Sequence, residues 1–196
     1  MKKIVYLPLD ERPCNYDFCG FIAQNNNDIN LVRPEKSDLG LKKKPAEYLK
    51  VKSFLSCECA DADYLILAVD MLLYGGIVPS RLHCLPQEEI FSRVDFIKTL
   101  KEANPNLKIF AFSLVMRCPT YSSGDEEPDY YEVYGERIFR YGVNEHKYID
   151  NLIAKDEYET EKNRLNVPEK YLNDYLSRRK ENLAALLRTL KLVGGA

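Results

Sequence analysis

The chain has 196 residues, of which 45% are hydrophobic and 30% are charged, and its formal net charge at pH 7 is −2. This length and composition are typical of one globular domain with a sizeable core. The near-neutral charge gives no basis for a general attraction to nucleic acid or to an anionic membrane surface. We therefore expect a small-molecule ligand as the partner, and neither nucleic acid nor membrane.

The N-terminal segment does not have the pattern of a signal peptide, because its apolar run is too short. No apolar run approaches the length of a transmembrane helix, so a cytoplasmic location is the default expectation. The six cysteines include no Cys-x-x-Cys pair, and His83 and His146 are not at ligand spacing. Free buried thiols are therefore expected, and structural zinc is not.

Short apolar runs alternate with amphipathic segments in the first part of the chain. We predict strands at residues 4–9, 29–32, 63–69 and 107–116. Helices are predicted between them, over residues 16–23 with Asn15 as the cap, from Pro45 to near Cys59, and from Pro86 to a stop at Asn104. This β-α-β-α-β-α-β order indicates an α/β fold with a parallel sheet and right-handed crossovers. The spacing fits either a doubly wound sheet or half of a TIM-like barrel.

The composition changes at Asp129, where a tyrosine-rich helical stretch begins and extends to about Leu152. The charged segment of residues 154–166 is predicted to be helical with a break, and a last helix begins at Pro168, with Gly194 as its C-cap. We predict a parallel α/β core over residues 1–128 and a helical segment over residues 129–196 packed on it, as a single domain overall. The chain could equally be the front part of a longer protein.

Three of the four predicted strands end in charged residues. The carboxyl ends of parallel strands lie at one edge of a sheet, so these residues are expected to converge there on a ligand site. The candidates are Asp10, Glu11, Arg12 and Asn15 after the first strand, Asp70, Tyr74, Gly75, Gly76, Ser80 and Arg81 after the third, and Arg117, Glu126, Glu127, Asp129 and Tyr130 after the fourth.

Paired carboxyl groups at such an edge suit glycoside chemistry, which needs two of them about 5 to 9 Å apart across a sugar ring. We predict a hydrolase acting on a carbohydrate or polyol-like small molecule. Asp70 and Glu127 are its favoured carboxyls, one as the acid and the other as base or nucleophile, and Asp10 is a third. The 14 tyrosines, in a chain without tryptophan, would supply stacking faces and hydroxyls for a polyol.

Other functions fit the same residues. The arginines could hold the acids in a structural network, or could bind a small anionic metabolite without catalysis, helped by the Gly75 and Gly76 amides. No cofactor is expected, although Asp10, Glu11 and Asp70 could hold a divalent cation such as magnesium or manganese. A further alternative is an N-terminal fragment of a longer enzyme, which would form a homodimer or need its missing C-terminal portion.

Three segments of the sequence resemble the hallmarks of a bacterial family of domains of unknown function, number 4127. These segments are long and specific, and they cover residues 7–15, 69–81 and 126–131. The resemblance extends over nearly the whole chain and implies that the chain corresponds to the N-terminal portion of longer members. It supports the candidate site segments and implies no particular reaction.

Overall fold

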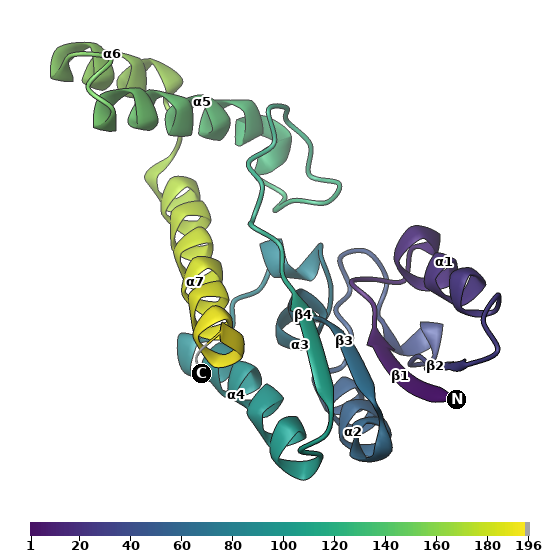
Figure 1. Cartoon of the computed structure of the whole chain (residues 1–196). Helices are drawn as coiled ribbons and strands as arrows, with labels where there is room; N and C mark the ends of the chain where they lie inside the picture. Colours follow the sequence, from purple (N-terminus) through teal and green to yellow (C-terminus); the bar gives the residue numbers. More distant parts are fainter. Residues whose placement is uncertain (195–196) are drawn as a thin grey trace. The chain divides into compact units, whose positions relative to one another are not determined.

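The structure, a computed structural model, describes residues 1–194 and has the predicted α/β fold with a parallel sheet followed by long helices (Figure 1). Its strands are β1 (Lys2–Leu7), β2 (Ile29–Val32), β3 (Tyr64–Ala68) and β4 (Lys108–Phe112). Its α-helices are α1 (Pro13–Ala23), α2 (Tyr48–Glu58), α3 (Val69–Tyr74), α4 (Gln87–Ala103), α5 (Tyr131–Ile149), α6 (Lys155–Leu165) and α7 (Glu169–Gly194). Short 3-10 helices are η1 (Lys36–Asp38), η2 (Cys59–Asp61) and η3 (Pro79–Arg81).

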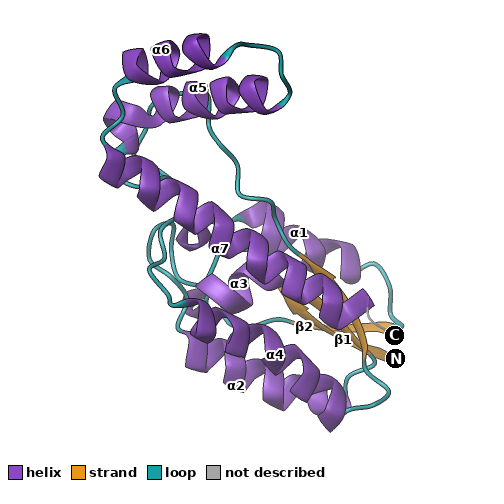
Figure 2. Cartoon of the chain, turned by 90° about the vertical axis from the view of Figure 1, so that its left-hand side faces the viewer, coloured by secondary structure: helices purple, strands orange, loops and turns teal. Residues whose placement is uncertain are grey.

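The sheet is parallel throughout and has the strand order β2-β1-β3-β4. In half of a barrel, consecutive strands would be neighbours, whereas here β3 lies beside β1 and not beside β2. The sheet is therefore doubly wound. Right-handed crossovers in this order place α1 on one face and both α2 and α4 on the other, as Figure 2 shows.

The main core lies on the α2 and α4 face of the sheet. Val5 and Leu7 of β1 and their register partners Leu65 and Leu67 of β3 have no exposed surface. They belong to one apolar cluster with Val51 and Leu55 of α2 and with Ile90, Val94 and Ile97 of α4. Burial of each such leucine stabilises the fold by roughly 1.5–3 kcal/mol, so this cluster fixes the strand ends that carry the candidate site.

The chain forms two compact units, which are described separately below. The first comprises Met1–Val115 together with the chain from Glu181 onward, and the second comprises Met116–Lys180. In the first unit, the C-terminal part of α7 contributes the buried Ala185, and Arg188 binds the Asp95 carboxylate of α4 at 2.5 and 2.9 Å. The predicted division after residue 128 stays a prediction, and its last two residues lie outside the described chain.

The second unit contains α5, α6 and the first part of α7. Its apolar cluster is built from Met116, Tyr131, Ile138 and Tyr175. The tyrosine-rich segment thus supplies the core of this unit, with the Tyr131 and Tyr175 rings 5.9 Å apart. Among the residues that the structure describes, no helix combines the length and the apolar character needed to cross a membrane.

Several element boundaries differ from the predicted ones. α1 begins at Pro13, two residues before the predicted cap, because proline fits the first position of a helix. Asn15 lies inside this helix, and its side-chain amide binds Asp10 and does not cap the helix. α2 begins at Tyr48 and not at Pro45, because the Ala46 amide donates to the Gly75 carbonyl at 3.0 Å and the Glu47 backbone is extended.

α3 is a helix that the sequence analysis did not predict. It follows β3 directly, and all six of its residues are buried. A short helix with no polar face has no amphipathic periodicity, so its sequence cannot be distinguished from the end of a buried strand. This helix sets the position of Asp70 in its first turn and of the glycine pair at its end.

Candidate functional site

The boundary between β1 and β3 is the topological switch point of the sheet. The chain leaves β1 toward β2 on one side, and β3 lies on the other side. Ligands of open α/β sheets bind outside the carboxyl ends of the strands at such a point. Asp10 follows β1 and Asp70 follows β3. Two of the predicted carboxyl groups therefore flank the place where this fold class binds ligands.

Asp10 is buried, with 4% of its surface exposed, and is held by several donors. Its Oδ1 accepts hydrogen bonds from the Arg12 backbone amide at 3.1 Å and from the Asn15 side-chain amide at 2.6 Å. Its Oδ2 accepts one from Arg12 Nε at 2.7 Å. The structure thus brings together three of the predicted site residues. Charged and neutral donors on both oxygens fix this carboxylate in place.

Glu11 points to a neighbouring cavity at the same end of the sheet. Its Oε1 accepts a hydrogen bond from the Lys42 backbone amide at 3.1 Å. The cavity beside it has a volume of about 500 Å³, and its charged lining residues include Lys36, Asp38 and Lys50. This volume lies in the range of small-molecule sites, and the mixed polar lining suits a hydroxyl-rich ligand.

Asp70 is also 4% exposed, but its surroundings differ from those of Asp10. Its Oδ2 accepts hydrogen bonds from Ser113 Oγ at 3.1 Å and from the Leu114 backbone amide at 2.9 Å. Burial raises the pKa of this carboxyl above the ordinary value of 3.8, and both hydrogen bonds and the charge of Arg81 oppose the rise. A buried carboxyl with a raised pKa suits the role of a general acid.

The Gly75-Gly76 pair ends α3. Gly75 has a φ of 82°, and its amide donates to the Met71 carbonyl at 3.0 Å, while the Gly76 amide donates to the Asp70 carbonyl at 3.4 Å. A Cβ atom at Gly75 would lie 2.6 Å from the Ala46 backbone nitrogen. Both backbone amides are therefore bonded within the helix cap. This favours a plain turn at these two residues over a loop that binds an anion through its amides.

The remaining predicted residues after the third strand, Tyr74, Ser80 and Arg81, are also buried. Tyr74 is 5% exposed, and its ring stacks on that of His83 at 4.4 Å. Burial raises the pKa of its phenol, and the charge of Asp70 adds to the rise. Ser80 donates from Oγ to the Ile77 carbonyl at 2.7 Å. Arg81 is 5% exposed, and its charge acts on Asp70. This edge of the first unit is therefore a buried polar cluster.

The cluster includes residues that the sequence analysis missed. Asn182 of α7 donates to the Ser80 carbonyl at 2.8 Å, and its Oδ1 lies 2.8 Å from His83 Nε2. The charge of Glu181 acts on Tyr74 together with that of Asp70. About a hundred residues separate α7 from these partners, and no motif or spacing in the sequence signals such a contact.

The candidates after the fourth strand belong to the second unit. Glu127 is 1% exposed and its Oε1 lies 3.0 Å from Arg117 Nε, while Glu126 lies 3.6 Å from the same guanidinium. Tyr130 donates to Asp174 at 2.6 Å, and Asp129 is exposed. The structure thus brings Arg117, Glu126 and Glu127 together. The pairing of Glu127 with Asp70 stays a prediction.

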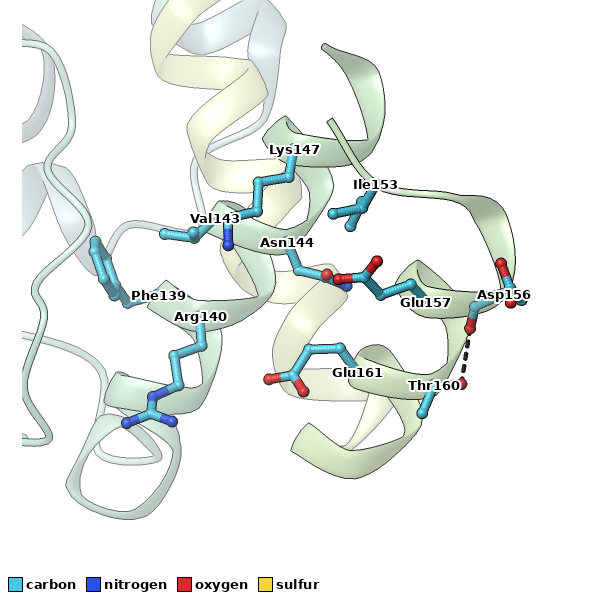
Figure 3. A pocket seen from close by; sticks show the side chains of 10 residues that line it. All are labelled: Phe139, Arg140, Val143, Asn144, Lys147, Ile153, Asp156, Glu157, Thr160 and Glu161. Atoms are coloured by element: carbon cyan, nitrogen blue, oxygen red, sulfur yellow. Dashed lines mark hydrogen bonds between the residues drawn. The ribbon is translucent and has the colours of Figure 1, made fainter. Parts of the chain in front are cut away.

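The second unit also has a cavity of about 550 Å³ between α5 and α6. Figure 3 shows Glu157 and Glu161 of α6 pointing toward α5, which supplies Arg140 and Lys147. Glu161 also binds Arg164 through two contacts of 2.7 Å. The cavity contains no predicted site residue, and its lining carries charges of both signs, with three acidic side chains and two basic ones.

No group of three or more His, Cys, Asp or Glu side chains in the described part of the chain is arranged to hold a metal ion.

The fold and its switch-point carboxyls define an open, doubly wound α/β protein. The chain belongs to the family DUF4127, described as proteins of unknown function, whose model matches residues 4–195. Searches of the curated proteins and of the solved structures each found no match.

Proposed function

We propose that the protein is a hydrolase that acts on a carbohydrate or polyol-like small molecule at the switch point between β1 and β3. One observation carries this proposal: Asp10 and Asp70 are both buried there, in contrasting surroundings. In hydrolases that use two carboxyl groups, different environments give the two groups different pKa values, so that one acts as the acid and the other as the base. The proposed setting is the bacterial cytoplasm.

Each carboxyl has a distinct role in the proposed reaction. Asp70, whose pKa burial raises, donates a proton to the oxygen of the leaving group. Asp10, held by Arg12 and Asn15, acts as the base that takes a proton from water, or as the nucleophile. Arg12 and Arg81 orient the hydroxyl groups of the substrate.

A second candidate function is binding of a small anionic metabolite without catalysis. Asp70 Oδ2 already accepts two hydrogen bonds from residues 113 and 114, which is also what a purely structural carboxyl would do. In this alternative, Arg12 and Arg81 supply the positive charge, and the carboxyls only hold the arginines.

Hydrolysis of a panel of nitrophenyl glycosides tests the first function, with EDTA and with Mg²⁺ present in parallel. The wild-type protein is expected to turn over at least one substrate, and Asp70→Asn and Asp10→Asn each to lose about 100-fold or more in rate. Asp95→Asn, which changes a half-exposed carboxylate, is the matched control and keeps the rate. Stabilisation by anions alone, lost in Arg81→Ala and without turnover, would establish the second function instead.

A further inference from the structure

The first unit has another cavity, of about 280 Å³, whose charged lining is entirely basic. It lies between the turn before α2, the end of α3, the segment after η3 and α4. Lys43, His83 and Arg93 line it, and among the described residues no acidic side chain does. Its other lining residues are mainly apolar or aromatic, including Pro79, Leu82, Leu85 and Tyr48. A pocket with this composition favours an anion that carries an apolar body.

Arg93 is a fixed positive group in this cavity. Its side chain is 12% exposed and donates hydrogen bonds to the Leu73 carbonyl and to Glu89. The guanidinium carbon lies 4.3 Å above the centre of the Tyr48 ring, a cation–π contact. Its buried Nε has no hydrogen-bond partner within the described residues. These contacts hold the guanidinium rigidly at the wall of the cavity.

Tyr74 forms another part of the wall. Its buried hydroxyl likewise finds no hydrogen-bond partner in the part of the chain that the structure describes. Burial raises the pKa of this phenol, so it stays a neutral donor at physiological pH. A buried polar group without a partner costs roughly 1–3 kcal/mol. His83, stacked on the Tyr74 ring, is held in place by Asn182.

Lys43 stands at the tip of a tight turn at the cavity. The turn is closed by reciprocal backbone hydrogen bonds of 2.9 Å between Leu41 and Lys44. The short turn limits where the Lys43 backbone can lie, and Lys43 is one of the residues that line the cavity. Together with Arg93, it supplies two cationic groups on different elements.

We propose that this cavity binds a small aromatic anion, a carboxylate or a phosphate monoester. Lys43 and Arg93 hold the anionic group, and the aromatic and apolar wall packs against the ring. A volume of 280 Å³ corresponds to about nine water molecules at roughly 30 Å³ each, enough for a ligand of phenyl phosphate size. This inference does not depend on the proposed hydrolase activity.

Cys84 provides a direct reporter, because it is exposed and lines the cavity. Cys14 and Cys57 are also exposed and do not line it, so they are internal references. Alkylation by N-ethylmaleimide, followed at each cysteine by mass spectrometry, measures occupancy in the folded protein. With phenyl phosphate at about ten times its dissociation constant, Cys84 is expected to react about tenfold more slowly, and Cys14 and Cys57 at unchanged rates.

A pair of lysine variants tests the role of charge. Lys43→Met is expected to weaken phenyl phosphate binding about fivefold, whereas Lys98→Met, on the exposed surface of α4, leaves it unchanged. Asp10→Asn, which changes the other proposed hydrolase carboxyl, leaves Cys84 protection intact, which separates this site from the hydrolase proposal. The inference is overturned if Cys84 is not protected, if all three cysteines are slowed equally, or if benzyl alcohol protects as well as phenyl phosphate.

Discussion

Asp10 and Asp70 follow two neighbouring strands, and each lies three residues beyond a member of the register pair Leu7–Leu67. Both carboxyls are buried to the same extent. Asp10 is surrounded by an arginine and an amide, whereas Asp70 receives one hydroxyl and one backbone amide. The parallel register therefore brings two carboxyls to one edge, and their local partners make them chemically different.

Two substitutions of Asp70 separate the contribution of its charge to stability from that of its hydrogen bonds. Asparagine keeps an oxygen that can accept from Ser113 and Leu114, so Asp70→Asn is expected to change the free energy of unfolding by less than about 1 kcal/mol. Asp70→Ala leaves both donors without their acceptor and is expected to cost about 2–4 kcal/mol. Urea denaturation of the two variants measures this difference, and equal losses would show that the hydrogen bonds do not contribute.

The raised pKa of Asp70 predicts a specific pH dependence of stability. Above about pH 3.8 the unfolded chain releases this proton before the folded protein does, so the folded state binds more protons. The stability contributed by protonated Asp70 is therefore fully present below that pH and is lost as the pH rises through the folded pKa. The free energy of unfolding of the wild type, relative to Asp70→Asn, is expected to fall across this window. A relative stability that rises with pH would contradict the assignment.

Gly75 tests the fixed geometry of the loop that follows Asp70. Gly75→Ala combines a positive φ with a close approach to Ala46 and is expected to destabilise the protein by about 2–4 kcal/mol. Gly142 of α5 is the control, because a Cβ atom added there meets nothing within 4 Å. Gly142→Ala is expected to stabilise by about 0.5–1 kcal/mol. Thermal denaturation compares the two, and similar effects would exclude a special role for Gly75.

Asn182 links α7 to the site cluster. Asn182→Ala removes its bonds to the Ser80 carbonyl and to His83, and is expected to cost about 1–3 kcal/mol. Asn173→Ala, at an exposed position of the same helix, is the matched control and is expected to change stability by less than about 0.5 kcal/mol. Chemical denaturation followed by circular dichroism measures both. A loss in the control as large as that in Asn182→Ala would attribute the effect to the helix and not to the cluster.

The strands and the edge that carries Asp10 and Asp70 were predictable, because apolar runs such as residues 64–69 and 29–32 are bounded by polar turns. The strand order was not predictable, because the residues of β1 and β3 do not indicate which strand each will pair with. α3 was missed because its buried residues have no polar face to mark a helix. Asn182 was missed because contacts between distant segments follow from packing, which no local pattern encodes.

Carbon-13 NMR of the aspartate carboxyl groups tests the central claim most directly, because it reports the protonation and the surroundings of Asp10 and Asp70 separately. The measurement is a pH titration of the labelled protein, with and without a neutral sugar that stabilises it. We expect the Asp70 signal to titrate above pH 3.8, and the signals of both residues to move when the sugar binds. An Asp70 signal that titrates below pH 3.8, with neither signal responding to any sugar, would contradict a carbohydrate site at the switch point.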